Sequence, residues 1–339
     1  MTRRSWHARC GAAVVSVALI APLFAAAAPA VAVGTRAGWT AQPSMRVPQG
    51  GLVAVSVAGQ IYTFGGFTTD LAAPVRTAQR YSTGTQRWTL LPPMPTARGD
   101  AAAAAVDHAI YVIGGYGPVA AVRTVEVFDR STSTWRTGTP LPTPLAGAAA
   151  VAVGHRIYVI GGYDSSNIAV GTVEIYDTRT GLWSSGPPMT VPRGNLRAVR
   201  SGNRIYAVGG ATTDGTPLAE VEAYRPGQHA WHAVAPLSTP REGEGLATGA
   251  GGWIYAIAGL NGPGSFTASA ERYDPDTNRW TALPSLPASR ARAGMGAGRG
   301  THGSIIAVGG LQLAAGHVRA TAYVDALHVA HGCPTQTWT

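Results

Sequence analysis

Four arginines occupy equivalent places in a repeating pattern, and together they could bind an anion. They are Arg98, Arg193, Arg241 and Arg290, and the same place is taken by Gln49 and Leu145 elsewhere in the chain. A guanidinium group forks onto carboxylate or sulfate oxygens with two parallel hydrogen bonds. Asn195 and Glu242 follow two of these arginines and add polar groups. The pattern therefore predicts a ligand site made of the residues Arg98, Arg193, Arg241, Arg290, Asn195 and Glu242.

The same arginines have a second interpretation as internal structural groups. An acidic residue recurs two positions before an aromatic one, at Glu126, Glu174, Glu222 and Glu271, with Gln79 in the first unit. A carboxylate that recurs in several units is a poor candidate for a single catalytic group, so we expect a structural hydrogen-bond partner. Each arginine could pair with such an acid or with a main-chain carbonyl, and this alternative stays open beside the ligand site.

Several short motifs resemble catalytic or metal-binding signatures, but their context argues against each. Residues 298–303 match the GxGxxG pattern, yet a strand is expected after them where a nucleotide site needs a helix. Arg98-Gly99-Asp100 spells a cell-adhesion tripeptide that begins an inner strand. His328, His331 and Cys333 are metal-ligand types near the C-terminus, and we expect neither a metal site nor a cofactor. No Gly-x-Ser-x-Gly, His-Glu-x-x-His or phosphate loop occurs in the sequence.

The elements that must position these residues form an internal repeat. A pair of small residues ends at Gly66, Gly115, Gly162, Gly210, Gly259 and Gly310, at intervals of 47 to 51 residues. A tryptophan recurs at Trp39, Trp88, Trp135, Trp183, Trp231 and Trp280, at intervals of 47 to 49 residues. Two markers that stay in phase six times indicate six copies of one structural unit.

Each unit reads as a four-stranded antiparallel sheet. In the third unit, a small apolar run at 147–153 and runs rich in β-branched and aromatic residues at 157–160 and 172–176 are separated by turn residues, and a last strand begins at Trp183. One such sheet cannot bury both faces alone, whereas six arranged radially can. We predict an all-β fold, a six-bladed β-propeller of four-stranded antiparallel blades. Because Trp39 precedes any first strand and the last unit lacks a tryptophan at the equivalent offset, the N-terminal segment should close the last blade.

The alternation of strands also fixes which connections share a face. The connection into each first strand and the connection after each Gly-Gly pair should lie on one face, with the tight turns on the other. The arginines belong to the first set and should ring one mouth of the central channel. The longer loops over that mouth hold Asp70, Tyr116, Tyr163, Asp164, Asn167, Asp214, Asn261 and His317. Loops on a rigid scaffold are where binding residues gather.

The motifs Ile-Tyr-x-x-Gly-Gly, Glu-x-Tyr-Asp, Trp and Leu/Met-Pro-x-x-Arg resemble the Kelch repeat family over about residues 39–329. In some Kelch propellers this face binds acidic peptides or sugar acids through arginines near these positions, which is what the resemblance implies for the four arginines here. Departures are local: Ala258 replaces a glycine, Arg225 replaces an aspartate, and the sixth unit is degenerate after Gly310. Copper oxidases of similar fold use a Cys–Tyr cross-link. Cys333 is the single cysteine outside the leader and lies outside the expected blades, so it does not suit such a cross-link.

Three functions follow from this resemblance. The first is a non-enzymatic extracellular binding module for an anionic glycan or acidic peptide at the arginine-lined mouth. The second is a sugar-acting enzyme, such as a mutarotase or epimerase of an acidic sugar, with Glu242, Glu244 or His317 as general acid or base. The third is a protein–protein scaffold without a small ligand. A deeply buried carboxylate beside two arginines would favour the enzyme, and a wide, shallow mouth would favour the binder.

The N-terminus reads as an export signal. Residues 1–32 have a basic start, an apolar stretch and Ala30-Val31-Ala32 as a small-residue cleavage site, although an uncleaved anchor is the alternative. We expect a propeller over 33–330, a tail over 331–339 and a secreted monomer without a membrane span after cleavage. The net charge of +9 falls to +6 without the leader's three arginines, and no basic run remains. Nucleic acid is therefore not an expected partner, in contrast to a protein or glycan ligand.

Overall fold

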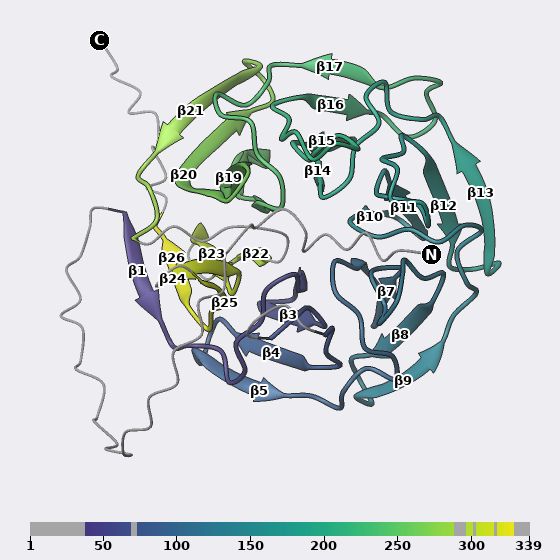
Figure 1. The fold of residues 1–339 in the computed structure, drawn as a ribbon, viewed down its shortest axis with the longest axis horizontal. Coiled ribbons are helices and arrows are strands. Elements are labelled where there is room, and N and C mark those ends of the chain that lie inside the picture. The colour runs from purple at the N-terminus through teal and green to yellow at the C-terminus, as the bar shows by residue number, and fades with distance from the viewer. Residues whose placement is uncertain (1–37, 69–72, 288–295, 301–302, 315–316, 329–339) are drawn as a thin grey trace, which may run out of the picture.

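Six small sheets stand like blades around one axis in a computed structural model of the chain (Figure 1). The residues described are 38–68, 73–287, 296–300, 303–314 and 317–328. Each blade has four antiparallel strands, and a separate two-stranded hairpin accompanies the sixth. The all-β, six-bladed propeller expected from the repeat is confirmed. The leader 1–32, Arg290 and the tail 331–339 lie outside the described residues.

The first three blades follow the chain in order from the axis to the rim. Blade 1 consists of β2 (Val53–Val57), β3 (Gln60–Phe64), β4 (Ala78–Ser82) and β5 (Arg87–Leu90). Blade 2 consists of β6 (Ala102–Val106), β7 (Ala109–Ile113), β8 (Val125–Asp129) and β9 (Thr134–Thr137). Blade 3 consists of β10 (Ala149–Val153), β11 (Arg156–Ile160), β12 (Val173–Asp177) and β13 (Leu182–Gly186).

The fourth and fifth blades repeat this order, and the sixth combines both ends of the chain. Blade 4 consists of β14 (Arg197–Ser201), β15 (Arg204–Val208), β16 (Val221–Tyr224) and β17 (His232–Val234). Blade 5 consists of β18 (Gly245–Thr248), the 3-10 turn η3 (Ala250–Gly252), β19 (Ile254–Gly262), β20 (Ser265–Asp274) and β21 (Arg279–Leu283). Blade 6 consists of β22 (Gly296–Arg299), β23 (Ile305–Val308), β26 (Val324–Leu327) and β1 (Trp39–Gln42), and the hairpin of β24 (Leu311–Ala314) and β25 (His317–Ala320) precedes β26.

Strand β1 closes the ring from the N-terminal side. It pairs antiparallel with β26, with Trp39 opposite Leu327 and Gln42 opposite Val324. The outer strand of the last blade therefore comes from the first described segment of the chain, as the position of Trp39 predicts. This pairing covers the edge of β26 that would otherwise be exposed.

A ring of tryptophans ties each blade to the one before it. The indole Nε1 of Trp88 donates to the carbonyl oxygen of Pro43 at 2.9 Å, and that of Trp135 donates to Pro92 at 2.9 Å. The same bond recurs from Trp183, Trp231, Trp280 and Trp39 to Thr139, Pro187, Ala235 and Pro284. Within a blade the tryptophan packs on the aromatic residue of the third strand, as Tyr81 and Trp88 do at 5.1 Å between ring centroids. Each tryptophan thus packs as a large apolar ring and also donates one hydrogen bond through its indole nitrogen.

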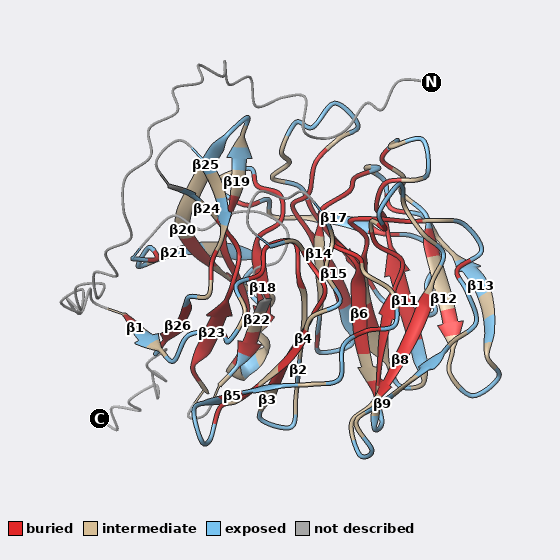
Figure 2. Ribbon diagram, turned by 60° about the horizontal axis from the view of Figure 1, so that its bottom comes forward, coloured by how far each residue is buried: buried red, intermediate tan, exposed pale blue. Residues whose placement is uncertain are grey.

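The apolar core is divided among the interfaces between blades. Six buried clusters are present in the described residues, and each draws on two neighbouring blades. In the cluster between blades 3 and 4, for example, Tyr158 and Ile160 meet Ile205 and Tyr224. Burial follows the same plan, because second strands such as β3 and β11 are mostly buried and rim strands such as β5 and β13 are largely exposed (Figure 2).

The Gly-Gly pairs are required by backbone geometry. In blade 3, Gly161 and Gly162 have φ angles of 60° and 109°, in the left-handed region. A Cβ atom on Gly162 would lie 2.9 Å from the carbonyl oxygen of Ala146, where the connection into the first strand passes. In blade 5, Ala258 takes the first position with a φ of 55°, which a non-glycine residue adopts only at some cost.

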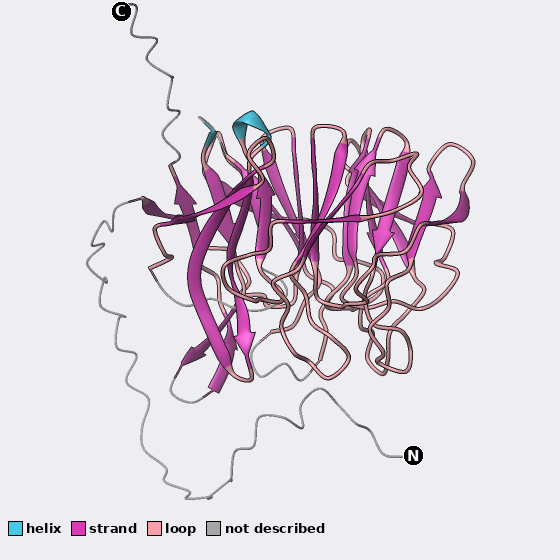
Figure 3. Cartoon of the chain, turned by 90° about the horizontal axis from the view of Figure 1, so that it is seen from above, coloured by secondary structure: helices cyan, strands magenta, loops and turns pink. Residues whose placement is uncertain are grey.

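The two faces of the propeller differ as the alternation of strands predicts. We call the face that carries the connections into first strands the loop face, and the opposite face, which bears η3, the turn face (Figure 3). Isolated bridges join the connections into blades 1 to 5 to the segments after the Gly-Gly pairs, for example Gly99 to Tyr116 and Gly194 to Ala211. Near blades 5 and 6, the extended β19–β20 hairpin and the β24–β25 hairpin project on the loop face (Figure 3).

Candidate functional site

The three described arginines among the predicted site residues are fully buried in ion pairs. Arg98, Arg193 and Arg241 each have an exposed fraction of 0%. Each pairs with the glutamate on the third strand of its own blade, in the pairs Arg98–Glu126 at 2.9 Å, Arg193–Glu222 at 3.1 Å and Arg241–Glu271 at 2.5 Å. Burial lowers the pKa of all three guanidinium groups and the paired carboxylates oppose that shift. A guanidinium group nevertheless stays protonated in a protein.

These pairs fasten the incoming connection to the inner strands. Arg98 also donates to the carbonyl oxygen of Val112 at 3.2 Å, and Arg241 to that of Ala258 at 2.9 Å. The carboxylate of Glu222 accepts from the amide of Thr190 at 2.8 Å. The glutamates are thus structural hydrogen-bond partners, as expected. Direct contact between these three arginines and a ligand stays a prediction, and the fourth, Arg290, lies outside the described residues.

We call each pair of side chains that joins an incoming connection to the third strand of its blade a latch. Blade 1 has a neutral latch in place of the ion pair. Gln49 takes the place of the arginine and Gln79 that of the glutamate. The Nε2 atom of Gln79 donates to Oε1 of Gln49 at 2.6 Å, and both side chains are fully buried. In blades 1, 2, 4 and 5 a matched pair, charged or neutral, thus joins the third strand to the incoming connection.

The other two predicted residues meet each other at the mouth. Asn195 donates from Nδ2 to Oε2 of Glu242 at 2.7 Å, and both are almost fully buried. Asn195 belongs to a chain of main-chain bonds that circles the mouth through five blades. The amides of Asp100, Gly147, Asn195 and Gly243 donate to the carbonyl oxygens of Gly51, Asp100, Gly147 and Asn195 at 2.8–2.9 Å. The corresponding residue of blade 6 lies outside the described residues.

Aromatic rings from the long loops build the wall of the mouth. The ring of Phe67 lies over Gly99, where an added Cβ atom would come within 2.2 Å, and Tyr163 covers Gly194 in the same way. The hydroxyl of Tyr116 donates to Oδ1 of Asn167 at 2.5 Å. Asp164 caps its own loop through the amide of Ser166 at 2.8 Å. Gly99 in the Arg-Gly-Asp triplet therefore has a structural purpose.

The remaining predicted loop residues belong mainly to turns and projecting hairpins. Asp214 accepts hydrogen bonds from Thr216 inside its own loop. Asn261 lies in β19 and the exposed His317 in β25, on the two hairpins that project from the loop face. Asp70 lies outside the described residues. The structure therefore does not bring this set together at one point.

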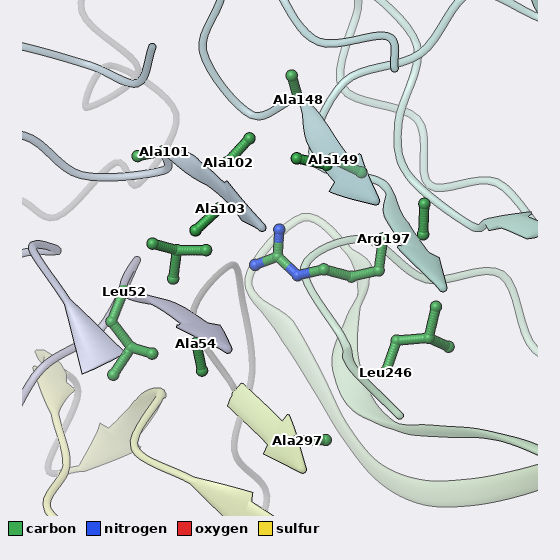
Figure 4. A pocket seen from close by; sticks show the side chains of 13 residues that line it. Leu52, Ala54, Ala101, Ala102, Ala103, Ala148, Ala149, Arg197, Leu246 and Ala297 are labelled. Atoms are coloured by element: carbon green, nitrogen blue, oxygen red, sulfur yellow. The ribbon is translucent and has the colours of Figure 1, made fainter. Parts of the chain in front are cut away.

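Arg197 is the charged group that the sequence patterns did not single out. It lies at the start of β14, and its side chain reaches into the central channel among alanines (Figure 4). Strand registers place it level with Val53, Ala102, Ala149, Gly245 and Gly296 in the other five blades. Those small residues leave room for one long side chain. Alignment of the six units by this column would have revealed Arg197, because no other blade carries a charge there.

The cavity around Arg197 measures about 70 Å³ and is otherwise lined by leucine, valine and alanine. Nε of Arg197 donates to the main-chain oxygen of Glu244 at 3.2 Å, and Nη1 donates to that of Leu196 at 3.4 Å. Burial lowers the pKa of Arg197, and the charges of Glu244 and Asp100 oppose the shift. The channel thus presents a half-buried cation in apolar surroundings.

Glu244 is a buried carboxylate behind Arg197. Its exposed fraction is 0%, and neither oxygen has a hydrogen bond to another described residue. Burial raises the pKa of Glu244 to about 7; its own amide, Arg197 and Arg241 oppose that rise, and Glu242 adds to it. A carboxyl that titrates near neutral pH can hold or release a proton under ordinary conditions.

At the turn face the channel widens to a cavity of about 330 Å³. Its charged lining residues are Arg200 and Arg299, both exposed. Among the residues that the structure describes, no acidic side chain lines either cavity. Within the described ranges, no cluster of three metal-ligating side chains is present. No helix of the described chain is long and apolar enough to cross a membrane.

Comparisons with known proteins agree with the fold. The model of the KLHDC2/KLHL20/DRC7 Kelch-repeats domain matches residues 36–190 and 137–310, which together span most of the chain. No curated protein matches the sequence. The solved structure of YjhT is similar with a TM-score of 0.72 and 16% sequence identity, over 86% of this chain and 98% of YjhT. At that identity the likeness concerns the fold alone.

Proposed function

This chain belongs to the Kelch-repeat family of β-propellers, and from that premise we propose that it is a binding module for a carboxylate-bearing ligand. The ligand is an anionic glycan or an acidic peptide that docks across the loop-face mouth. The observation that carries the proposal is Arg197, a cation placed in the channel where five other blades have small residues. A guanidinium in apolar surroundings attracts a carboxylate more strongly than one in water does.

The rest of the mouth supports binding by holding its shape. The buried ion pairs and the chain of main-chain hydrogen bonds through blades 1 to 5 hold the connections beside the channel. A mouth that is rigid before binding loses little conformational entropy when a ligand arrives. The buried arginines of the latches therefore support binding by holding the mouth in shape, and Arg197 supplies the positive charge that meets the ligand.

The export-signal pattern in residues 1–32 supports a secreted location for this module. An extracellular position would suit a glycan or peptide ligand. Appearance of the protein in the medium with its N-terminus at Val33 would agree with this proposal, and retention of residues 1–32 on a membrane-associated protein would contradict it.

The binding proposal is tested by titration calorimetry of the full chain with charged probes and matched neutral ones. Hexaglutamate is compared with hexaglutamine, and oligogalacturonate with its methyl ester. We expect a charged probe to bind and its neutral counterpart to fail. Arg197→Gln should weaken binding roughly ten- to hundredfold, since a charged hydrogen bond contributes about 1.5–3 kcal/mol. Arg200→Gln, a matched change at the turn face, should leave binding unchanged.

Two outcomes would contradict the binding proposal. Failure of both charged probes would argue for a protein–protein scaffold. Equal affinity for the wild type and Arg197→Gln would place the site elsewhere. Thermal melts give an independent readout, because a ligand at 100 times its Kd adds about 2.7 kcal/mol to the free energy of unfolding.

A second candidate, a sugar-acting enzyme, is favoured by Glu244 alone. Burial raises the pKa of this carboxylate to about 7, which is the range that general acid–base catalysis uses, and Glu244 lies behind Arg197 without itself lining the channel. The bound acidic sugar would then be followed by NMR for exchange between its anomers. Exchange that is accelerated by the wild type and lost in Glu244→Gln would support the enzyme, and an unchanged rate would leave the binding module.

A further inference from the structure

Around the inner end of the mouth, some charged side chains form ion pairs and others do not. Arg193 and Arg241 are neutralised by Glu222 and Glu271, each in direct contact. Arg197 and Glu244 remain. Their only direct link runs from the Arg197 guanidinium to the main-chain oxygen of Glu244, so the carboxylate itself stays without a bonded cation.

The surroundings of Glu244 come from two blades. Its Oε1 atom would lie 3.2 Å from a Cβ atom added to Gly209, which places the carboxylate against the Gly-Gly turn of blade 4. The charged groups that act on it are Arg193 and Arg197 on the blade 4 side and Arg241 and Glu242 on its own connection. Asp100 is the other carboxylate that acts on Arg197.

We propose that Arg197 and Glu244 form a proton-linked carboxylate site, in which a ligand carboxylate binds Arg197 from the channel while Glu244 takes up one proton from solvent. The inference relies on the proposed function only for the end of the channel at which a ligand enters. It adds a second ligand, the proton, and a condition under which the site works.

The physical reason is charge balance in a poorly solvated place. With Glu244 ionised, an arriving carboxylate would join Asp100 and Glu244 as a third negative charge near one guanidinium. Buried charges of like sign repel strongly, because water screens them little. Protonation of Glu244 removes one of these charges without moving any side chain, so a ligand carboxylate and the proton favour each other's binding.

The first test uses acetate as the probe, because its carboxylate stays ionised from pH 6 to 8 and its small body suits a narrow cavity. Titration calorimetry of the full chain is run at both pH values and in buffers with different ionisation enthalpies. We expect acetate to bind about tenfold more tightly at pH 6 than at pH 8, since Glu244 with a pKa of about 7 is mostly protonated only at the lower pH. Proton uptake should approach one per acetate at pH 8.

Variants separate the two partners. Glu244→Gln keeps the shape and removes the titration, so its affinity at pH 8 should match that of the wild type at pH 6. Arg197→Gln should abolish acetate binding at both pH values, and Arg200→Gln should behave as the wild type. In the wild type, a carbon-13 label on the glutamate carboxyls should show the pKa of Glu244 rising when acetate is added.

Three results would overturn the inference. The first is an acetate affinity that is equal at pH 6 and pH 8. The second is a pH dependence of acetate affinity that persists in Glu244→Gln. The third is an acetate affinity that is the same in Arg197→Gln as in the wild type. These outcomes are distinct from failure of the proposed function. Acetate can bind with a proton even if hexaglutamate and oligogalacturonate do not, and either larger probe can bind without any proton uptake.

Discussion

At the scale of single residues, the same side-chain type has opposite surroundings within a few positions. Arg193 is fully buried and paired with Glu222, whereas Arg197 reaches into the channel and meets only main-chain oxygens. Arg193 stands before the inner strand, and Arg197 opens it. The role of an arginine in this fold is thus set by its place relative to the strand.

Glu244 should make the protein less stable as the pH rises from about 5 to 8. Its pKa is raised to about 7 in the folded state, so between the unfolded value of 4.5 and 7 the folded state binds more protons and loses stability with rising pH. The loss attributable to this residue is on the order of 3 kcal/mol. Urea unfolding across this range should show the decline in the wild type and a flatter curve in Glu244→Gln. Identical slopes would mean that Glu244 is already ionised at low pH.

At the scale of the element, four of the described blades have a latch between the incoming connection and the third strand. The latch is ionic in blades 2, 4 and 5, neutral in blade 1, and Leu145 replaces the arginine in blade 3. Burial raises the pKa of Glu174 in that blade, with a hydrogen bond from Ser185 opposing the rise. Blade 3 shows that a blade can form without the arginine.

Removing one partner of a latch should lower the free energy of unfolding more than substituting both partners together. Arg193→Ala leaves Glu222 as a buried charge without its partner and should cost about 3–5 kcal/mol of unfolding free energy. The double variant Arg193→Gln with Glu222→Gln copies the Gln49–Gln79 pair of blade 1 and should recover most of that loss. Urea titration measures both. A double variant as unstable as Arg193→Ala would show that the two latches are not interchangeable. Any loss of ligand binding in Arg193→Ala should be compared with binding by the double variant, because the single variant is also less stable.

The sequence was a good guide to elements and a poorer one to side-chain direction. Two markers in phase gave six blades, and the lone Trp39 gave the closing strand, because repeats of this length have few compact solutions. The arginine pattern marked the connections into the first strands, and three of its four members are described and buried in ion pairs there. Whether a guanidinium points to a ligand or to Glu126 depends on packing between strands far apart in the chain, which residue types alone do not encode. Arg197 was missed because it breaks the repeat, and repeats draw attention to what recurs.

At the scale of the whole molecule, stability depends on ring closure. Deletion of residues 33–43 removes β1 and with it the Trp39–Pro284 bond and the cover of β26. We expect the truncated chain to lose cooperative thermal unfolding in calorimetry. A synthetic peptide of residues 33–43 added in trans should restore it, since the missing piece is a strand that pairs by main-chain bonds. A truncated chain that still melts in one sharp transition would refute the role of the closure.

The pairing of β1 with β26 also bears on the order of events while the chain is made. Strand β1 is synthesised long before its partner β26, since Trp39 lies opposite Leu327. The entropy of closing so long a loop grows only slowly with length, by about 0.6 kcal/mol for each doubling. The long separation therefore affects the rate of folding more than the stability, because contacts distant in sequence slow folding. A nascent or prematurely ended chain would be an open arc with an unpaired edge, and a chaperone or protease could recognise completion of synthesis by the disappearance of that edge.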